Sequence, residues 1–294
     1  MRVVLGILRT MRPKQWTKNV LFIFPAILFD GQLLNMNALG RVVLAALLMI
    51  VMSGTVYIIN DLVDVEKDRQ HPKKRTRPIA SGEVPIRVAV TAAFILPTAT
   101  LLFALWWDRS LAVVMLIYLI VQVTYSLYLK HVPILDILAV TTGFVLRILA
   151  GVVVIDVANF SPWLYACGAL LALFLVVGKR RQELLTLGET ALKTRPIFEH
   201  YNLALLDDML RLVVNATFIA YLLYTIEVDT VRIADINASL VTVPFVLYAL
   251  FRYLYLIHVR GEGSAPDEVL LTDRPLQLAI FGWGLTVFIL IYLF

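Results

Sequence analysis

Long apolar runs, each closed by charged residues, prolines or glycines, are the feature that most constrains this chain. A bilayer core offers no water to backbone N–H and C=O groups, so an apolar run of about 20 residues spans it only as a helix. Of the 294 residues, 60% are hydrophobic and 16% are charged, and the mean hydropathy is +0.84. Soluble domains contain roughly 45–50% apolar residues. The composition therefore excludes an ordinary soluble enzyme, a disordered chain and a disulfide scaffold, and predicts a polytopic membrane protein.

Nine apolar runs are candidate transmembrane helices. We expect an all-α fold in which these helices form one bundle. The whole chain, 1–294, is expected to be one domain, and residues 1–18 within it are expected to form an interfacial amphipathic segment. The first and sixth runs are short for the hydrocarbon core. The expected spans are 20–35, 39–62, 84–105, 111–129, 134–155, 162–177, 206–226, 239–257 and 276–294.

The basic residues orient this bundle. With the amino terminus inside, 22 of the 26 Lys and Arg residues fall on the inner side of the membrane. Because cytoplasmic loops collect Lys and Arg, we expect a cytoplasmic amino terminus and a multi-pass protein of the cell inner (plasma) membrane. The two longest polar loops, 63–83 and 178–205, then lie on the cytoplasmic face. We expect the active site to lie there.

Carboxylates appear where the second apolar run ends. Asp61, Asp64 and Asp68 are spaced three and four residues apart, and Asn60 lies four residues before Asp64, so all would share one helix face. Three carboxylates on one face repel one another unless a cation is bound. The ligands are all oxygens, which favours Mg²⁺, or Mn²⁺ as a second possibility. The alternative is a solvated helix end beyond the headgroups.

A basic loop follows directly. Pro72 and Pro78 prevent a regular helix, and four bases lie between them. Anionic lipid headgroups would attract such a loop, but beside an acidic metal face it also supplies the second half of a phosphate site. The bases expected to bind substrate are Lys73, Arg75 and Arg77.

The pattern NDxxDxxxD at residues 60–68, followed by HPxKRxRPIASG at 71–82, resembles the UbiA-like superfamily of intramembrane prenyltransferases. The amino-terminal RPKQWTKN at 12–19 and the nine apolar runs also fit it, so the resemblance covers essentially the whole chain. It implies that the acidic motif binds Mg²⁺ and a diphosphate, with Asn60, Asp61, Asp64 and Asp68 as metal ligands and the three aspartates catalytic.

The region after the sixth run departs from typical members, which carry a second aspartate-rich motif there. Here Glu183 is the one acidic residue of 178–185, beside three bases. One metal face with a basic cluster suits a metal-bound diphosphate together with a second, anionic substrate. The candidate substrate-binding residues in this region are Lys179, Arg180, Arg181 and Glu183.

The chain most resembles the decaprenyl-phosphate phosphoribosyltransferase branch of the superfamily, through YSLYLK at 125–130, Asp136 and LRILAG at 146–151. The resemblance implies transfer of a phosphoribosyl group from 5-phosphoribosyl 1-diphosphate to a polyprenyl phosphate, with release of pyrophosphate, for lipid-linked pentose in cell-wall synthesis. Tyr125 and Lys130 are further candidate substrate contacts. Expected partners are these two substrates and the bilayer, without nucleic acid and with a homo-oligomer possible.

Arg147 lies inside an apolar run, where a charge costs at least ~2.5–3.5 kcal/mol. Asp136 is too distant along the same helix to neutralise it, so Arg147 needs an interhelical partner or a phosphate. We therefore include Arg147 among the candidate substrate-binding residues.

Two other functions fit part of the pattern. A UbiA-like aromatic prenyltransferase would use the same Mg²⁺ face for a prenyl diphosphate, but it would need acidic residues where 178–185 is basic. A transporter or lipid flippase would place charges near the bilayer midplane, where this chain has Arg147 alone.

Overall fold

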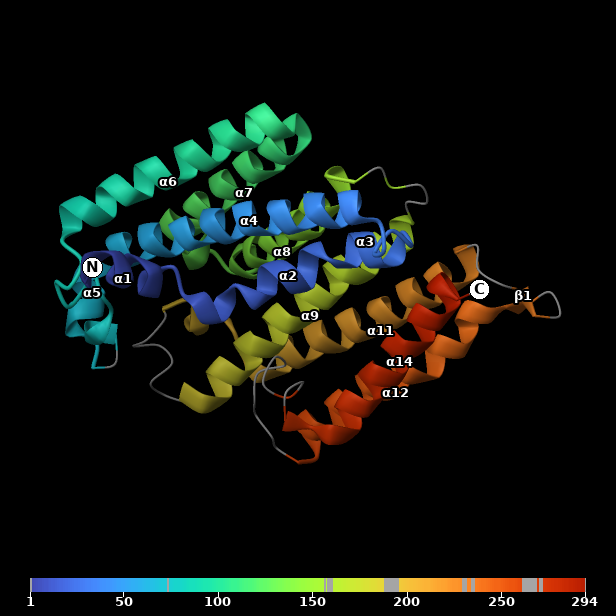
Figure 1. The fold of residues 1–294 in the computed structure, drawn as a ribbon. Helices are drawn as coiled ribbons and strands as arrows, with labels where there is room; N and C mark the ends of the chain where they lie inside the picture. The colour runs from blue at the N-terminus through green and yellow to red at the C-terminus, as the bar shows by residue number, and fades with distance from the viewer. Residues whose placement is uncertain are drawn as a thin grey trace. The chain divides into compact units, whose positions relative to one another are not determined.

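The computed structural model describes the chain apart from residues 1, 73, 156, 158–160, 188–195, 229–231, 234–235, 261–268, 270–271 and 294. Helices make up most of the described residues (Figure 1). The chain divides into two compact units. The first comprises residues 1–130 and 142–158, and the second comprises 131–141 and 159–294.

The first unit contains one short amphipathic helix, two short apolar helices, one short polar helix and three long helices. It also contains the larger part of a fourth long helix. The two short apolar helices meet at Phe24 and Pro25, because proline cannot donate a backbone hydrogen bond within a helix. The elements are α1 (Arg2–Thr10), η1 (Pro13–Gln15), α2 (Thr17–Ile23), α3 (Pro25–Phe29), α4 (Met36–Val63), α5 (Val65–Gln70), η2 (Lys74–Thr76), α6 (Ile86–Trp107), α7 (Arg109–Leu127), η3 (Leu129–His131) and α8 (Leu135–Val153).

Helices α4, α6 and α7 pack on one another in the first unit (Figure 1). Side-chain caps define where two of them begin. Asn35 accepts hydrogen bonds from the N–H groups of Asn37 and Ala38 at the start of α4, and Asp108 accepts one from Leu111 at the start of α7. The buried side chains of α4 include Met49 and Met52, and they form the centre of this unit's core.

The second unit is built from four long helices, of which α9 packs on α11 and α12 packs on α14. A short antiparallel pairing, with Arg232 opposite Asn237, lies between α11 and α12 in the sequence. The elements are α9 (Pro162–Leu187), η5 (Pro196–His200), α11 (Leu203–Glu227), β1 (Arg232–Ile233), β2 (Ile236–Asn237), η6 (Ala238–Thr242), α12 (Val243–His258) and α14 (Arg274–Tyr292).

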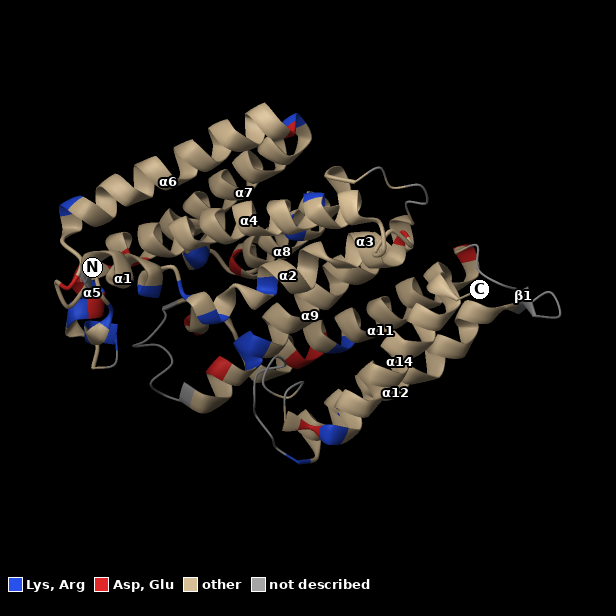
Figure 2. Ribbon diagram, in the orientation of Figure 1, with Lys and Arg blue, Asp and Glu red and all other residues tan. Residues whose placement is uncertain are grey.

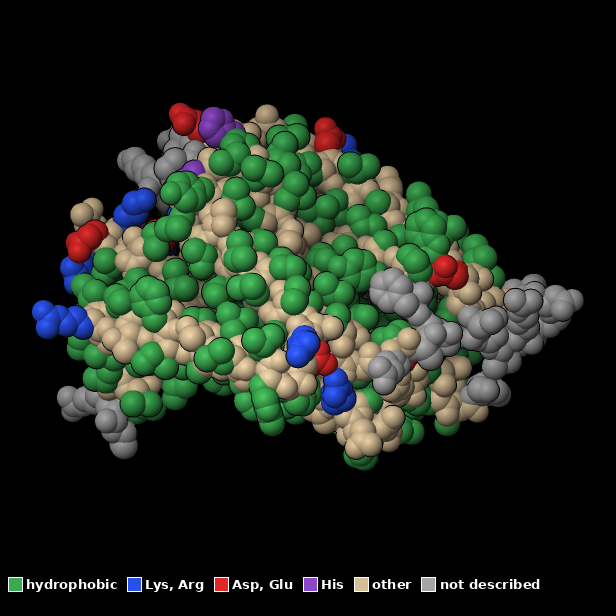
Figure 3. Space-filling view, turned by 90° about the horizontal axis from the view of Figure 1, so that it is seen from above, with side chains coloured by type: hydrophobic (Ala, Val, Ile, Leu, Met, Phe, Trp, Pro, Cys, Tyr) green, Lys and Arg blue, Asp and Glu red, His purple; other side chains and the backbone are tan. Residues whose placement is uncertain are grey.

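The predicted all-α, multi-span membrane fold is confirmed. Eight helical segments among the described residues are long and apolar enough to cross a bilayer. Large apolar side chains such as Phe94 and Leu102 are exposed, and they suit contact with lipid. Figure 3 shows one face covered largely by apolar side chains with few charged ones. The first expected span, 20–35, corresponds to the shorter apolar stretch Thr17–Phe29, so the count of nine stays a prediction.

Two segments expected as loops are partly helical. Helix α9 continues past the expected end at Val177 to Leu187, because Lys, Arg, Gln, Glu and Leu are strong helix formers and Gly178 alone does not end the helix. The expectation that 178–205 is a loop is therefore wrong for its first part, which carries the four candidate residues. The expected loop 63–83 likewise contains α5 and η2.

Close packing of α8 against α2 depends on Gly151. A Cβ atom at Gly151 would overlap the carbonyl oxygen of Ile23, which is backbone and cannot rotate away. We expect Gly151→Ala to destabilise the protein by about 1–3 kcal/mol through overpacking. Thermal unfolding in detergent, followed by tryptophan fluorescence, measures the effect.

Gly40→Ala is the matched control, because Gly40 lies in helix α4 and a Cβ there meets no atom within 4 Å. The control is expected to unfold at the same or a slightly higher temperature, since alanine favours helix by up to about 1 kcal/mol. Equal melting temperatures for Gly151→Ala and the wild type would contradict the close packing.

Candidate active site

Asp61, at the end of α4, and Asp68, on α5, share one cation. The Nη1 atom of Arg77 lies 3.1 Å from Asp61 Oδ1 and 2.6 Å from Asp68 Oδ2. Both carboxylates are almost fully buried, with 3% and 2% of their surfaces exposed. A buried carboxylate is stable in its charged form only when it is paired. The fold therefore brings two of the predicted site aspartates around a single position for a positive charge.

Arg12 is a second cation on Asp61, and it is not among the site residues expected from the sequence. Its Nη2 donates to Asp61 Oδ1 at 2.9 Å, and its guanidinium lies 4.5 Å from the ring centre of Tyr57. Arg12 has a left-handed backbone, with φ 54°, which non-glycine residues adopt at a cost. The ion pair with Asp61 helps to hold this backbone conformation in place. The RPKQWTKN pattern at 12–19 is the sequence signal that could have identified it.

The segment that carries Arg12 is fixed to α4 by its neighbours. Met11 is buried against Gly54 of α4, where any Cβ would collide with the methionine side chain. Trp16 Nε1 donates to the carbonyl oxygen of Met11 at 3.2 Å. The absence of a side chain at Gly54 thus lets the amino-terminal segment approach closely enough for Arg12 to reach Asp61.

Asp64 pairs with a different base. Helix α4 ends at Val63 and α5 begins at Val65, so Asp64 sits at the break between them, with φ −96° and ψ 8°. Its Oδ1 accepts from Lys130 Nζ at 3.0 Å. The expectation of one continuous helix face for all three aspartates is therefore wrong. The break gives the third carboxylate its own cation, which reduces the repulsion among the three. Asn60 is half-buried in the last turn of α4.

The three aspartates are balanced by three bases, and charges gather where α1 and α5 lie in the first unit (Figure 2). Among the described residues, no three His, Cys, Asp or Glu side chains are arranged to hold a metal ion. The full four-ligand metal set stays a prediction. The donor atoms of Asp61 and Asp68 nevertheless fit a hard cation, because both are carboxylate oxygens directed at one point.

The other expected contacts in the first unit are less constrained. Arg75 is exposed on η2, and Tyr125 is half-buried on α7. Lys73 lies outside the described residues. Their assignment to substrate stays a prediction.

Arg147 is buried in α8 and its hydrogen-bond partners are neutral. Its Nε donates to Asn19 Oδ1 at 2.7 Å, its Nη1 to the carbonyl oxygen of Gly143 at 2.6 Å, and its Nη2 to Tyr118 Oη at 2.8 Å. The rings of Tyr118 and Phe144 lie 4.9 and 5.3 Å from the guanidinium carbon. The predicted interhelical partner therefore exists, and it joins α8 to α2 and α7.

In the second unit, Arg180 is held by two carboxylates. Its Nε lies 3.0 Å from Asp136 Oδ2 and its Nη1 lies 2.9 Å from Glu183 Oε2. Tyr201 donates its hydroxyl to Asp136 at 2.6 Å and accepts the N–H of Ile134 at 2.7 Å. Burial, with the Asp136 hydrogen bond, raises the pKa of Tyr201 to about 12, so the phenol stays protonated as a donor. The pairing of Asp136 with Arg180 and Tyr201 was not expected from the sequence, because it depends on tertiary structure.

The remaining bases of α9 differ in their contacts. Arg181 Nε lies 2.5 Å from Asp207 Oδ1, and Arg181 is 8% exposed. Lys179 is exposed. Arg180 and Arg181 are therefore paired with carboxylates inside the second unit, whereas Lys179 presents its ammonium group to the surroundings. The assignment of Lys179, Arg180, Arg181 and Glu183 to substrate stays a prediction.

Comparison with known proteins bears on the family and the fold of the chain. The model of the UbiA prenyltransferase family matches residues 20–182. The chain is 34% identical to a decaprenyl-phosphate phosphoribosyltransferase of Mycolicibacterium smegmatis, over 99% of this chain and 93% of the relative. It is 32% identical to the protein of that name from Corynebacterium glutamicum, over 98% and 87%. The resemblance predicted from residues 60–68 and 71–82 is thereby confirmed.

A solved structure shares the fold. A UbiA homolog from Archaeoglobus fulgidus, bound to DMAPP and Mg²⁺, aligns with a TM-score of 0.71 and 20% identity, over 97% of this chain and 99% of that chain. At this identity the likeness supports the fold alone.

The contacts of Arg147 predict a structural role. Arg147→Met removes the donor to Asn19 and Tyr118. Each buried polar group left without a partner costs about 1–3 kcal/mol, so we expect a clearly lower melting temperature in detergent. Arg211→Met is the control, because Arg211 is exposed and pairs only with Asp208 one turn away among the described residues. An unchanged melting temperature together with a raised KM would instead place Arg147 on a substrate.

Proposed function

Since the chain belongs to the UbiA prenyltransferase family, we propose that it is a polyprenyl-phosphate phosphoribosyltransferase. It transfers the 5-phosphoribosyl group of 5-phosphoribosyl 1-diphosphate to a polyprenyl phosphate and releases pyrophosphate. The product is a lipid-linked pentose for cell-wall synthesis. The observation that carries the proposal is the similarity to phosphoribosyltransferases over nearly the full chain.

The acidic end of α4 supports a site for a metal-bound diphosphate. Mg²⁺ is usually held by one or two carboxylates together with substrate phosphates, and Asp61 and Asp68 supply two carboxylates around one cation position. Asp64 and Asn60 lie in the same segment and complete the proposed ligand set. When bound, Mg²⁺ would neutralise charge on the departing pyrophosphate.

The bases that pair with the aspartates have a second role in this proposal. A divalent cation between Asp61 and Asp68 would take the place of the Arg77 guanidinium. Arg77 and Arg12 would then be available to donate hydrogen bonds to phosphate oxygens, for which guanidinium geometry is well suited. Lys130, whose Nζ lies 3.0 Å from Asp64 Oδ1, would likewise attract a phosphate oxygen, as a point charge.

The transfer itself needs little proton chemistry. A lipid phosphate oxygen is anionic near neutral pH, attacks C1 of the ribose and forms the new C–O bond, while the bond from C1 to the diphosphate oxygen breaks. The contribution of the chain's residues is to position the two substrates and to stabilise the negative charge that moves onto pyrophosphate. Lys73, Arg75 and Lys179 are proposed as further phosphate contacts, and Tyr125 as a substrate contact.

The proposed setting is the plasma membrane, with the acidic end of α4 on the cytoplasmic side. The excess of Lys and Arg in the expected inner segments supports this orientation. Phosphoribosyl diphosphate is soluble and charged, so it would enter from the cytoplasm, whereas the polyprenyl tail would stay in the bilayer. We further propose that residues 1–294 act as one catalytic domain.

The direct test uses the full chain in proteoliposomes with Mg²⁺, labelled phosphoribosyl diphosphate and decaprenyl phosphate. We expect formation of a labelled lipid and release of pyrophosphate, both abolished by a chelator and restored by Mg²⁺. Reaction of a prenyl diphosphate with an aromatic acceptor, without any lipid-linked phosphoribose, would contradict the proposal and favour an aromatic prenyltransferase.

A second prediction concerns the shared cation position. Asp68→Asn removes one of the two charges around it, so we expect turnover to fall by at least about 10²-fold and the half-saturating Mg²⁺ concentration to rise. Initial rates measured across a Mg²⁺ titration give both quantities.

Glu66→Gln is the matched control, because Glu66 lies on the same short helix but is exposed and pairs with Arg69. It should leave the Mg²⁺ dependence unchanged. If Asp68→Asn and Glu66→Gln behave alike, Asp68 does not contribute to a metal site.

A further inference from the structure

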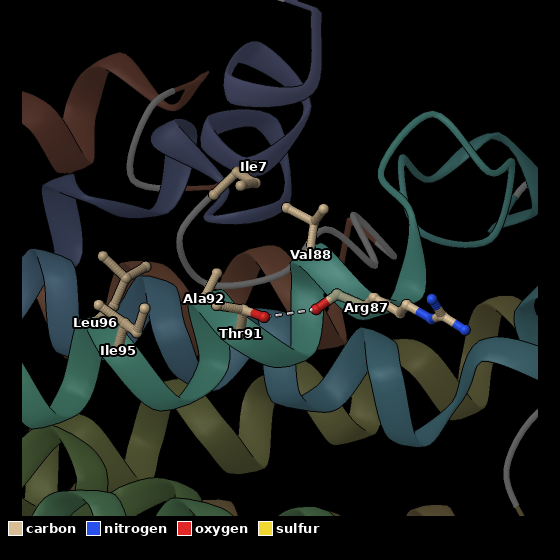
Figure 4. Close-up of a pocket in the computed structure, with 7 residues that line it drawn as sticks. All are labelled: Ile7, Arg87, Val88, Thr91, Ala92, Ile95 and Leu96. Atoms are coloured by element: carbon tan, nitrogen blue, oxygen red, sulfur yellow. Dashed lines mark hydrogen bonds between the residues drawn. The ribbon is translucent and has the colours of Figure 1, made fainter.

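A groove of about 380 Å³ lies between α1 and α6 in the first unit, and none of the site aspartates lines it (Figure 4). Ile7 of α1 lines one side, and α6 residues from Arg87 to Leu96 line the other. Helix α6 is a candidate membrane span and α1 is amphipathic, so the groove lies along the first turns of a helix that enters the bilayer.

Most of the lining is apolar. Val88, Ala92, Ile95 and Leu96 present hydrocarbon side chains. Thr91 is the polar exception, but its hydroxyl donates to the carbonyl oxygen of Arg87 at 2.9 Å, within the same helix (Figure 4). The walls therefore suit a hydrocarbon chain and offer little to a polar ligand.

Arg87 gives one end of the groove a positive charge. Its side chain is exposed, and it forms no ion pair with any residue in the described part of the chain. It also lies in the first turn of α6, where a cation opposes the helix dipole and a bound anion would relieve that repulsion. By contrast, nearby Arg9 pairs with Glu83 and Arg69 pairs with Glu66.

We propose that this groove binds one acyl chain of an anionic bilayer phospholipid, with the lipid phosphate on Arg87. The positions of charge and apolar surface match those of a phospholipid. Arg87 lies at the start of the α6 span, where a lipid phosphate would lie, and the apolar lining residues of α6 come later in the span, where an acyl chain would lie. Val4, Leu5 and Leu8 of α1 are exposed and apolar, so this helix lies at the headgroup level where such a phosphate is found.

The bound lipid has a structural consequence. Met11, directly after α1, packs in one cluster with Ile58, Ile79 and Val84, and Ile7 lies at the edge of that cluster. A lipid against Ile7 would therefore hold α1 in place, and with it the segment that carries Arg12. The binding itself is independent of the proposed reaction.

The test is photo-crosslinking of the full-length protein in vesicles of phosphatidylcholine doped with a diazirine-labelled phosphatidylglycerol, with adducts mapped by peptide mass spectrometry. We expect adducts on Ile7 and on 87–96. Arg87→Gln should lower their yield about fivefold, as expected for one basic group at an anionic surface. Thr91→Phe, which fills the groove from an exposed position, should remove them.

Arg109→Gln is the control, because Arg109 is likewise exposed and begins a span, α7, but does not line the groove. It should leave the adducts unchanged, and melting temperatures should show that all three variants are folded. Equal labelling by a phosphatidylcholine probe, or no adducts at these residues, would overturn the proposal. Displacement by polyprenyl phosphate at lower concentrations than by phosphatidylglycerol would also overturn it, because the groove would then hold the acceptor lipid.

Discussion

The need to neutralise two buried carboxylates is the constraint on which the first unit's polar structure depends. Asp61 and Asp68 are almost fully enclosed in a chain that is mostly apolar. An unpaired charge in such surroundings would be protonated or would destabilise the fold by several kcal/mol. Arg77 meets the requirement for both aspartates with a single nitrogen, and Arg12 adds a second cation on Asp61.

This pairing explains why distant segments of the first unit meet. Arg12 reaches Asp61 across 49 positions of sequence and Lys130 reaches Asp64 across 66. The left-handed backbone of Arg12, the close approach of Met11 at Gly54 and the break at Asp64 all serve these contacts. The amino-terminal segment, which has the composition of an interfacial anchor, is therefore also part of the candidate site.

The sequence was sufficient for features that depend on local pattern. Hydropathy predicted the membrane helices, and the spacing of Asp61, Asp64 and Asp68 predicted an acidic helix end. Contacts between segments distant in the sequence were harder to predict. Nothing near Arg12 in the sequence identifies Asp61 as its partner. The carboxyl-terminal end of α9 depends on helix propensity, which the drop in hydropathy at Gly178 obscured. Arg147 needed a partner on energetic grounds, but the choice of Asn19 and Tyr118 follows from packing.

The basic side chains of the ion pairs differ in how far solvent reaches them. The side chains of Arg12, Arg77 and Lys130 are 35%, 29% and 19% exposed, so water or a ligand can reach them while they remain paired. The side chain of Arg180 is 7% exposed and held by two carboxylates. The carboxylates on these bases differ from the bases themselves, because Asp61 and Asp68 are almost fully buried, and removing their bases without a replacement cation would cost about 3–5 kcal/mol. In the proposed reaction, a metal ion bound with the diphosphate would supply that replacement charge, so Arg12 and Arg77 could turn to phosphate oxygens without leaving a buried carboxylate unpaired.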